Sequence, residues 1–302
     1  MPDTIWLDGR YLPASRAHVP VTTHAIHYGT CAFEGIRAYW DGSNLHVFRL
    51  GDHMARLMRS CSMYGMRPRF TAARMGEAVV GTIRRKKLRG PTYARPFCFV
   101  GDHGISLHVD GRARVRSAVM AFPMGRIFPE GGISARIVSR RKIPEEAVPV
   151  QAKMAGNYLN SIAATAEARA AGADEAILLD SRGMVSEAPG ENIFVVRRGT
   201  ASTPPIAASA LDGITRDTVL ELAAGAGIPC AVEDLPRSSL AMADEVFLTG
   251  TAAEITPVTR IDGRRVGSGR PGPVTRRMAS LYDDAVHGRG AAREGWLTAV
   301  YP

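Results

Sequence analysis

The chain has 302 residues, of which 45% are hydrophobic and 22% charged, as in ordinary soluble proteins rather than disordered ones. It contains no run of eighteen apolar residues that would predict a membrane span, and its N-terminal residues lack the basic-then-apolar layout of a signal peptide. The four cysteines are widely spaced, which argues against a zinc site and against a disulfide framework. We therefore expect a cytoplasmic protein with reduced thiols, no metal and no membrane partner.

The net charge of +9 raises the question of a nucleic-acid partner. The strongest basic cluster, 84–89, closes a predicted helix in which Met75, Val79 and Ile83 repeat at four-residue spacing, with Gly90 placed to end it. Cations at a helix C-terminus are favourable against the helix dipole, so a solvated helix end accounts for the cluster. No nucleic-acid recognition motif accompanies it, and we expect no such partner.

Turn and alternation patterns in the first half predict hairpins interleaved with two helices. Asp8–Gly9 suits a tight hairpin turn, because both residues tolerate positive φ. Asp52 is placed to cap the first helix. The apolar face of that helix comprises Met54, Leu57, Met58 and Cys61. Strands are predicted at 5–7, 10–12, 36–40, 45–48, 93–100 and 115–122. Strands that are segregated from helices in this way favour an α+β class.

The length favours two domains, and a segment rich in proline and glycine at 122–133 is typical of a linker. We place a small domain at 1–124, an interdomain linker at 125–133 and a larger domain at 134–302. Strands of the larger domain are predicted at 133–139, 175–180, 184–186, 192–196 and 245–250. One helix is predicted at 157–171, ended by Gly172, and another opens at Thr215 and is followed by Gly227. A final hairpin turns at Asp262–Gly263.

The chain has only four lysines against 34 arginines, and one of them, Lys153, lies in an uncharged stretch at 148–161. Arginine stays protonated, whereas a lysine in apolar surroundings can lose its proton and form a Schiff base with a carbonyl group. The alternative is a lysine on a loop that faces water, which is the commoner situation for this residue. The stretch alone leaves both interpretations open.

An aldehyde cofactor such as pyridoxal phosphate on this lysine would need a phosphate site and a carboxylate for its pyridine nitrogen. Gly213–Asp217 enters a helix and Gly250–Ala253 follows a strand, so both offer hydroxyls and amides, although N-capping alone also explains Thr215. Glu187 follows a strand and precedes a Pro-Gly turn, where it can point into a cleft or lie solvated. Arg56 can add charge to a phosphate site or edge an amphipathic helix.

Two further groups of residues could recognise a substrate. Tyr93 and Arg95 share one face of a predicted strand, and a phenol beside a guanidinium suits a carboxylate. The alternative is a strand face whose polar residues point to solvent. Tyr28 and Phe33, with Arg37 close by, could wall an apolar pocket or pack a small core.

Six segments, in this order, resemble the branched-chain aminotransferases of the class IV (fold type IV) pyridoxal phosphate enzymes. They are HAIHYGTCAFEGIRAY at 24–39, YARPFCFVGDHG at 93–104, AKMAGNYLNS at 152–161, SEAPGENIF at 186–194, LDGITRD at 211–217 and TGTAAEITPV at 249–258. The resemblance covers nearly the whole chain. It implies a small α/β domain and a larger domain with a barrel-like sheet, joined by a linker loop, in a homodimer or higher oligomer. The implied reaction moves an amino group between a branched-chain or related hydrophobic L-amino acid and 2-oxoglutarate.

The resemblance also implies roles for individual residues. Lys153 would form the Schiff base with pyridoxal phosphate, Tyr158 would bond the cofactor's phenolic oxygen, and Glu187 would pair with the pyridine nitrogen. The phosphate would be held by Arg56, Ile214 (through its amide), Thr215 and Thr251. The substrate would be bound by Tyr28 (from a second subunit), Phe33, Gly35, Arg37, Tyr93, Arg95 (for the side-chain carboxylate of glutamate), Thr251 and Ala252.

The chain also departs from the family pattern. The Tyr-x-Arg at 93–95 and the Gly-Thr-Ala-Ala at 250–253 resemble the L-branched-chain branch rather than the D-amino acid transaminases. However, Ser139–Ile143 stands where the family usually has Trp-x-Arg, and Ile127 stands where an aromatic residue is usual. The alternative is a class IV relative with another substrate, namely a D-amino acid transaminase, an aminodeoxychorismate lyase or a specialised biosynthetic transaminase. We expect the unusual run at 139–147 to set the substrate preference.

Overall fold

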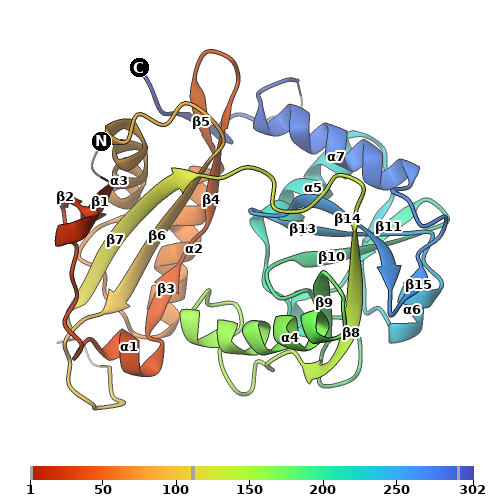
Figure 1. Ribbon diagram of the computed structural model, residues 1–302, viewed down its shortest axis with the longest axis horizontal. Coiled ribbons are helices and arrows are strands. Elements are labelled where there is room, and N and C mark those ends of the chain that lie inside the picture. Colours follow the sequence, from red (N-terminus) through yellow and green to blue (C-terminus); the bar gives the residue numbers. More distant parts are fainter. Residues whose placement is uncertain (1–2, 110–112, 291–292) are drawn as a thin grey trace. The chain divides into compact units, whose positions relative to one another are not determined.

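The computed structural model describes residues 3–109, 113–290 and 293–302, which fold into two compact units (Figure 1). The first unit comprises Met1–Gly125, Ala152–Gly156 and Val286–Pro302. The second unit comprises Arg126–Gln151 and Asn157–Ala285. The expected linker at 125–133 is not a separate body, because the division falls between Gly125 and Arg126.

The expected larger domain, 134–302, differs from the second unit at two segments that pack into the first. Ala152–Gly156 joins the first unit because the Phe33 N–H donates to the Lys153 carbonyl at 3.1 Å and Met154 forms a β-bridge with Ala32. The C-terminal segment joins it because β16 (Leu297–Ala299) pairs with β5 (Leu45–Phe48). Long-range backbone pairing of this kind leaves no signal in local sequence patterns.

The sheet of the first unit has the strand order β16-β5-β4-β6-β7-β1-β2, with β3 paired to β6, and all of its pairs are antiparallel. Its other strands are β1 (Thr4–Leu7), β2 (Arg10–Pro13), β3 (Cys31–Phe33), β4 (Ile36–Trp40), β6 (Thr92–Val100) and β7 (Val115–Pro123). The predicted β1–β2 hairpin is confirmed, with φ of 48° at Asp8 and 92° at Gly9.

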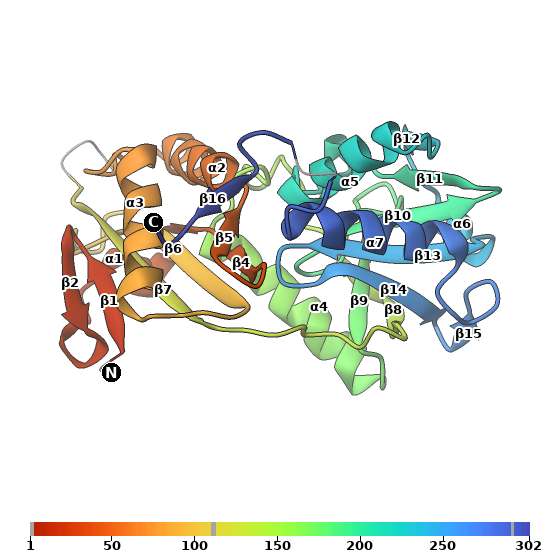
Figure 2. The same ribbon diagram turned by 90° about the horizontal axis from the view of Figure 1, so that it is seen from above.

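The helices of the first unit are α1 (His24–Tyr28), α2 (Leu50–Met63) and α3 (Ala72–Arg85), with a short 3₁₀ turn at Ala14–Arg16. Helices α2 and α3 lie on one face of the sheet (Figure 2). Their predicted apolar stripes are fully buried at Leu57, Cys61, Met75, Val79 and Ile83. Burying one such side chain contributes roughly 1.5–3 kcal/mol, so this packing fixes α2 against the sheet.

Two predicted helix ends are wrong. Helix α2 begins at Leu50 after Arg49, whose φ of 52° is left-handed, and Asp52 instead accepts a hydrogen bond from Arg49 Nε at 2.6 Å. Helix α3 ends before Gly90, because Lys87 takes the left-handed conformation with φ of 53°. Glycine is preferred there only because other residues incur a steric penalty, and tertiary contacts can override that preference.

The basic cluster at the end of α3 is engaged within the first unit. Lys86 forms an ion pair with Asp3, and Arg84 Nε donates to the Val300 carbonyl. Arg85 lies 4.2 Å from the centre of the Tyr11 ring. These contacts support the interpretation of the cluster as a helix end, and the absence of a nucleic-acid partner stays a prediction.

The sheet of the second unit has the strand order β12-β11-β10-β13-β14-β8-β9, with β15 paired to β14, and it mixes parallel and antiparallel pairs. Its strands are β8 (Ile133–Arg141), β9 (Glu175–Leu179), β10 (Asn192–Arg197), β11 (Thr200–Thr203), β12 (Cys230–Val232), β13 (Glu245–Gly250), β14 (Glu254–Ile261) and β15 (Arg264–Arg265). Its helices are α4 (Tyr158–Ala170), α5 (Ile214–Gly225), α6 (Arg237–Ala241) and α7 (Pro273–Val286), with a 3₁₀ turn at Ile206–Ala208. A further 3₁₀ turn, Ala155–Asn157, begins in the first unit and ends in the second.

This sheet curls into a half-barrel around its own apolar core. Along β9, Ile177 and Leu179 point into that core, whereas Leu178 points outward to pack with Ala164 and Ala168 of α4. The α+β class with a barrel-like sheet is therefore confirmed. The predicted strand at 184–186 is wrong, because Met184 and Val185 form only isolated bridges.

Within the described ranges, no helix is long and apolar enough to cross a membrane. Over the same residues, no three side chains of histidine, cysteine, aspartate or glutamate gather in a way that could hold a metal ion. All four cysteines are free thiols.

Candidate active site

In the first unit, Lys153 is fixed by its backbone rather than by a regular element. Its N–H donates to Ser60 Oγ of α2 at 3.0 Å, and its carbonyl accepts from the Phe33 N–H of β3. The Lys153 Nζ lies 5.1 Å from the centre of the Phe33 ring. The side chain thus leaves a clamped backbone beside an aromatic ring and is only partly exposed.

The environment of Lys153 disfavours a charged amine. Burial, reinforced by the nearby Arg56 guanidinium, lowers the pKa of Lys153 to about 8, although the Glu34 carboxylate acts in the opposite direction. A substantial fraction of the side chain is therefore neutral near physiological pH. A neutral amine carries the lone pair that attacks a carbonyl group, so the chemistry that the stretch at 148–161 suggested is available.

Arg56 does not lie at the edge of α2, because it is 4% exposed and belongs to a buried ion cluster. Its Nε and Nη2 donate to the two carboxylate oxygens of Glu34 at 2.6 and 2.9 Å, and His53 Nδ1 lies 2.7 Å from the same carboxylate. Burial alone would raise the pKa of Glu34, but Arg56 and His53 outweigh burial and hold it well below its usual range. Burial lowers the pKa of His53. The fork-to-fork pairing fixes the plane of the Arg56 guanidinium.

A second wall of the first unit combines aromatic rings with a guanidinium. Arg95 Nη2 donates to the Tyr93 hydroxyl at 2.8 Å, and the Arg95 guanidinium lies 4.6 Å from the centre of the Phe33 ring. Its buried Nε has no hydrogen-bond partner among the described residues. At Gly35, any side chain would collide with the Tyr93 hydroxyl, since a Cβ would lie 1.9 Å from that oxygen. The predicted pairing of Tyr93 with Arg95 is therefore present, and it requires glycine at position 35.

Arg37 and Tyr28, the remaining predicted pocket residues of this unit, lie in different settings. Arg37 of β4 is buried, donates from Nη2 to the Met124 carbonyl at 3.0 Å, and lies over the Tyr39 ring. Tyr28, the last residue of α1, is 42% exposed, and its hydroxyl donates to the Ile105 carbonyl at 3.1 Å.

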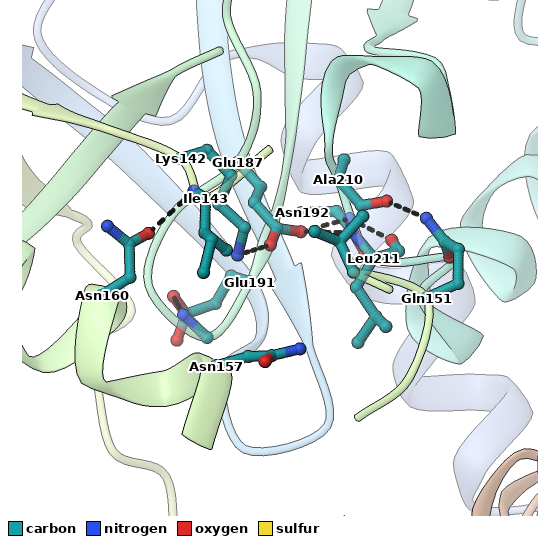
Figure 3. A network of polar contacts seen from close by, with 12 residues as sticks. Lys142, Ile143, Gln151, Asn157, Asn160, Glu187, Glu191, Asn192, Ala210 and Leu211 are labelled. Atoms are coloured by element: carbon teal, nitrogen blue, oxygen red, sulfur yellow. Dashed lines mark hydrogen bonds and ion pairs between the residues drawn. The ribbon is translucent and has the colours of Figure 1, made fainter. Parts of the chain in front are cut away.

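In the second unit, Glu187 is buried and its carboxylate is held by three donors (Figure 3). Lys142 forms an ion pair with Oε1, while Asn192 Nδ2 and the Leu211 N–H donate to Oε2 at 3.2 and 2.9 Å. Asn192 Nδ2 also donates to the Leu211 carbonyl at 2.8 Å. Glu187 is therefore an oriented acceptor and not the solvated turn residue that was the alternative.

The N-terminus of α5 presents its amides without a capping side chain, because Gly213 occupies the N-cap. The expectation that Thr215 caps this helix is wrong, since the helix starts at Ile214 and Thr215 lies within its first turn. A Cβ at position 213 would lie 1.9 Å from Asn192 Oδ1, so only glycine fits. Uncapped amides at a helix N-terminus, with the Thr215 hydroxyl beside them, are suited to an anion.

The other predicted residues of the second unit lie at the start of a helix and in a turn between two strands. Tyr158 is the first residue of α4 and is half-buried. Thr251 and Ala252 are half-buried in the turn between β13 and β14. That turn joins two antiparallel strands, so its amides belong to a hairpin and not to a helix.

Four side chains of these networks were missed from the sequence, namely Glu34, His53, Lys142 and Asn192. Signals for two of them exist. Glu34 stands between Phe33 and Gly35–Ile36, where a lone carboxylate must be paired if it is buried. His53 precedes Arg56 by three residues and thus shares its helix face. No local pattern pairs Lys142 with Glu187, which lies 45 residues later in the chain.

The family model for amino-transferase class IV matches residues 31–261. The chain belongs to the class IV aminotransferases. This aminotransferase is 41% identical to the branched-chain-amino-acid aminotransferase of Escherichia coli (strain K12), over 99% of this chain and 97% of the relative. The crystal structure of the branched-chain aminotransferase from Thermoproteus uzoniensis with norvaline is 45% identical, with a TM-score of 0.96 over 99% of each chain. That of the T.th. enzyme complexed with N-(5′-phosphopyridoxyl)-L-glutamate is 40% identical, with a TM-score of 0.95 over 99% of each chain. The predicted family is confirmed.

The buried ion cluster makes a prediction about stability. Glu34→Gln should lower the free energy of unfolding by about 3–5 kcal/mol, because it leaves the buried Arg56 without its counter-ion. Glu77→Gln is the matched control, since Glu77 also pairs with an arginine but lies exposed, and it should change stability by less than about 1 kcal/mol. Urea unfolding of both variants checks this, and equal losses would contradict it.

The lowered pKa of Lys153 makes a prediction about reactivity. The rate at which a simple aldehyde labels Lys153, trapped with cyanoborohydride and measured by peptide mass spectrometry, should rise through pH 8 and then level off. Below that pH the amine is protonated and cannot attack. Free N-acetyl-lysine in the same mixture is the control, and its labelling should keep rising because lysine in water has a pKa of about 10.4. Parallel profiles for the two lysines would refute the assignment.

Proposed function

We propose that this aminotransferase uses pyridoxal phosphate to move an amino group between a branched-chain L-amino acid and 2-oxoglutarate, with Lys153 as the lysine that holds the cofactor. The observation that carries the proposal is the partly buried Lys153, whose pKa is lowered to about 8, in a chain 41% identical over its length to a branched-chain-amino-acid aminotransferase. Lys153 also lies beside Phe33, one of the pocket residues predicted from the sequence.

The residues fit the cofactor, which when bound supplies an aldehyde for the amino group and a ring that withdraws electrons. The amides of Ile214 and Thr215, in the first turn of α5, would hold its phosphate, together with the Thr251 hydroxyl. Arg56 would add a guanidinium whose plane Glu34 already fixes. The carboxylate of Glu187 would accept a hydrogen bond from the ring nitrogen, and Tyr158 would bond the phenolic oxygen. The T.th. structure, which contains a phosphopyridoxyl group, supports this choice of cofactor.

Lys153 would act twice. Its neutral amine would hold the aldehyde of the cofactor, and when free it would take a proton from the substrate Cα and return it. A group with a pKa near the working pH can both accept and return a proton efficiently. The environment that lowers the pKa of Lys153 to about 8 therefore serves both steps.

The substrate must be bound in two chemically different forms, apolar and acidic. Tyr93, with the amides of Thr251 and Ala252, would receive the α-carboxylate. The Phe33 ring offers an apolar surface for a branched side chain, and Arg95 lies on that ring with a buried Nε that a second carboxylate could use. Arg37 would complete the pocket beside Gly35. The norvaline and glutamate moieties in the two solved relatives match this pair of requirements.

We also propose that a second copy of the chain packs against the first unit. An apolar cavity of about 320 Å³ beside α1 is lined by residues that include Val19, Ile26 and Phe97, and Val19 and Ile26 are exposed. Exposed apolar surface of this kind typically marks a protein interface. Tyr28 lies on the same helix as Ile26, which supports the proposal that Tyr28 contributes to the site of a partner subunit in a homodimer or higher oligomer. Free thiols at all four cysteines fit a cytoplasmic location.

A substrate panel tests the proposal against its class IV alternatives. With 2-oxoglutarate, L-leucine should yield L-glutamate with ping-pong kinetics, whereas D-alanine and aminodeoxychorismate, tested separately, should not be turned over. Lys153→Ala should lose activity by about 10³-fold or more, because it removes the reacting amine. Lys87→Ala, which removes an exposed lysine, should keep the wild-type rate. Turnover of D-alanine ahead of L-leucine, or an active Lys153→Ala variant, would overturn the proposal.

A further inference from the structure

The unusual run at 139–147 has three cationic side chains, and one of them points into the interior of the second unit, to which the run belongs. Arg140 is 56% exposed and interacts only distantly with Glu167, at 3.9 Å, and Arg141 is also exposed. Lys142 is 11% exposed, and its ammonium forms an ion pair with Glu187 Oε1 (Figure 3). Because arginine is by far the commoner cation in this chain, a largely buried lysine at this carboxylate needs an explanation.

The backbone on both sides of Lys142 is held so that its side chain has one direction. The Lys142 N–H donates to the Leu179 carbonyl at 2.8 Å, which extends the pairing of β8 with β9. Asn160 of α4 clamps the flanking residues, because its Nδ2 donates to the Arg141 carbonyl at 3.0 Å and its Oδ1 accepts from the Ile143 N–H at 3.2 Å. Lys142 is therefore part of a built site and not a surface side chain that happens to reach a carboxylate.

The acceptor positions of Glu187 are almost fully used. An ionised carboxylate has about four lone-pair sites. Asn192 and Leu211 take both sites of Oε2, and Lys142 takes one of Oε1. The described residues leave one site on Oε1, so a ring nitrogen that donates to Glu187 must share that oxygen with the lysine ammonium.

We propose that Lys142 is the positioning residue of Glu187, and that its charge sets how tightly the bound cofactor holds its protons. This inference rests on the proposed function. The ammonium fixes Oε1 for the ring nitrogen, and its positive charge disfavours any further proton close to it. Lys142 thus influences how strongly the cofactor ring holds its proton, and it does so through the Glu187 carboxylate and without contacting the substrate.

Among the described residues, charged groups of both signs accompany the pair on neighbouring elements. Glu191, on the loop before β10, is 9% exposed and is drawn with the pair in Figure 3. Arg216 of α5 is close enough to Glu187 for that carboxylate to influence its pKa, and it pairs with Asp212 at 3.7 Å. Because these groups carry both signs and do not change when Lys142 is replaced, the effect of the lysine can be measured separately.

This role differs from the expectation that the run at 139–147 sets the substrate preference. Ser139 and Arg140 interact with Glu167 on the outer surface of α4, and Lys142 reaches the carboxylate of the cofactor site. The Michaelis constants for different amino acids should therefore change little relative to one another when Lys142 is replaced.

Three substitutions separate charge from hydrogen bonding. Lys142→Arg keeps both, Lys142→Gln keeps a neutral donor, and Lys142→Met keeps neither. Arg141→Met is the control, because it removes an exposed cation from the neighbouring position. The readout is the pH at which the absorbance band of the bound cofactor, at roughly 400–430 nm, is half lost.

The Gln and Met variants should raise this midpoint by about one pH unit, because removing a nearby positive charge lets the cofactor hold its proton more tightly. Lys142→Arg and Arg141→Met should keep the wild-type midpoint. If the Met variant does not fold, the Gln variant carries the test, and if neither folds, a folded Lys142→Arg protein with a raised midpoint overturns the proposal. A Gln midpoint equal to that of the wild type also overturns it.

The same titration distinguishes a failure of this proposal from a failure of the proposed function. A wild-type protein with no band, and no turnover of L-leucine, would sink the proposed function itself. If the wild-type protein shows the band and turns over L-leucine, but the Lys142 variants have unchanged midpoints, only the proposed role of Lys142 is wrong. If the Lys142 variants change the Michaelis constants of different amino acids relative to one another but leave the midpoint unchanged, the run at 139–147 sets the substrate preference instead.

Discussion

Burial of Lys153 beside the Arg56 guanidinium, which Glu34 holds in place, lowers the pKa of its amine to about 8. A lysine in water is almost fully protonated at neutral pH and cannot attack an aldehyde. The fold therefore places a buried ion cluster of Glu34, His53 and Arg56 beside a residue outside any regular element. Removing one partner of such a cluster is strongly destabilising, so the same contacts that tune the amine also stabilise the first unit.

The second unit meets the opposite requirement, since it must keep a buried carboxylate oriented. Three donors hold Glu187, and one of them carries a charge. Glycine at position 213 leaves the amides of α5 uncapped and makes room for Asn192 Oδ1. One unit thus supplies an amine with a lowered pKa and the other a carboxylate surrounded by donors, each from its own internal contacts.

Much of the fold could be predicted from local patterns, because side-chain periodicity and turn residues report on nearby backbone. The apolar stripe through Leu57 and the Asp8–Gly9 turn are examples. Helix ends were less predictable, as at Lys87, where tertiary contacts override the glycine preference. The residues predicted for the site came from motifs, whereas the partners of Arg56 and Glu187 depend on pairing between distant segments. Periodicity carries no information about such pairing, so Glu34 and Lys142 emerged only from the structure.

The central claim is that Lys153 holds the cofactor, and covalent trapping tests it most directly. Protein incubated with pyridoxal phosphate, reduced with borohydride and digested should carry one pyridoxyl group, on the peptide that contains Lys153. Lys142 provides a demanding comparison, because it is the other lysine placed among the proposed cofactor residues. A pyridoxyl group on Lys142 or on no lysine at all would contradict the account, and a group confined to Lys153 would agree with it.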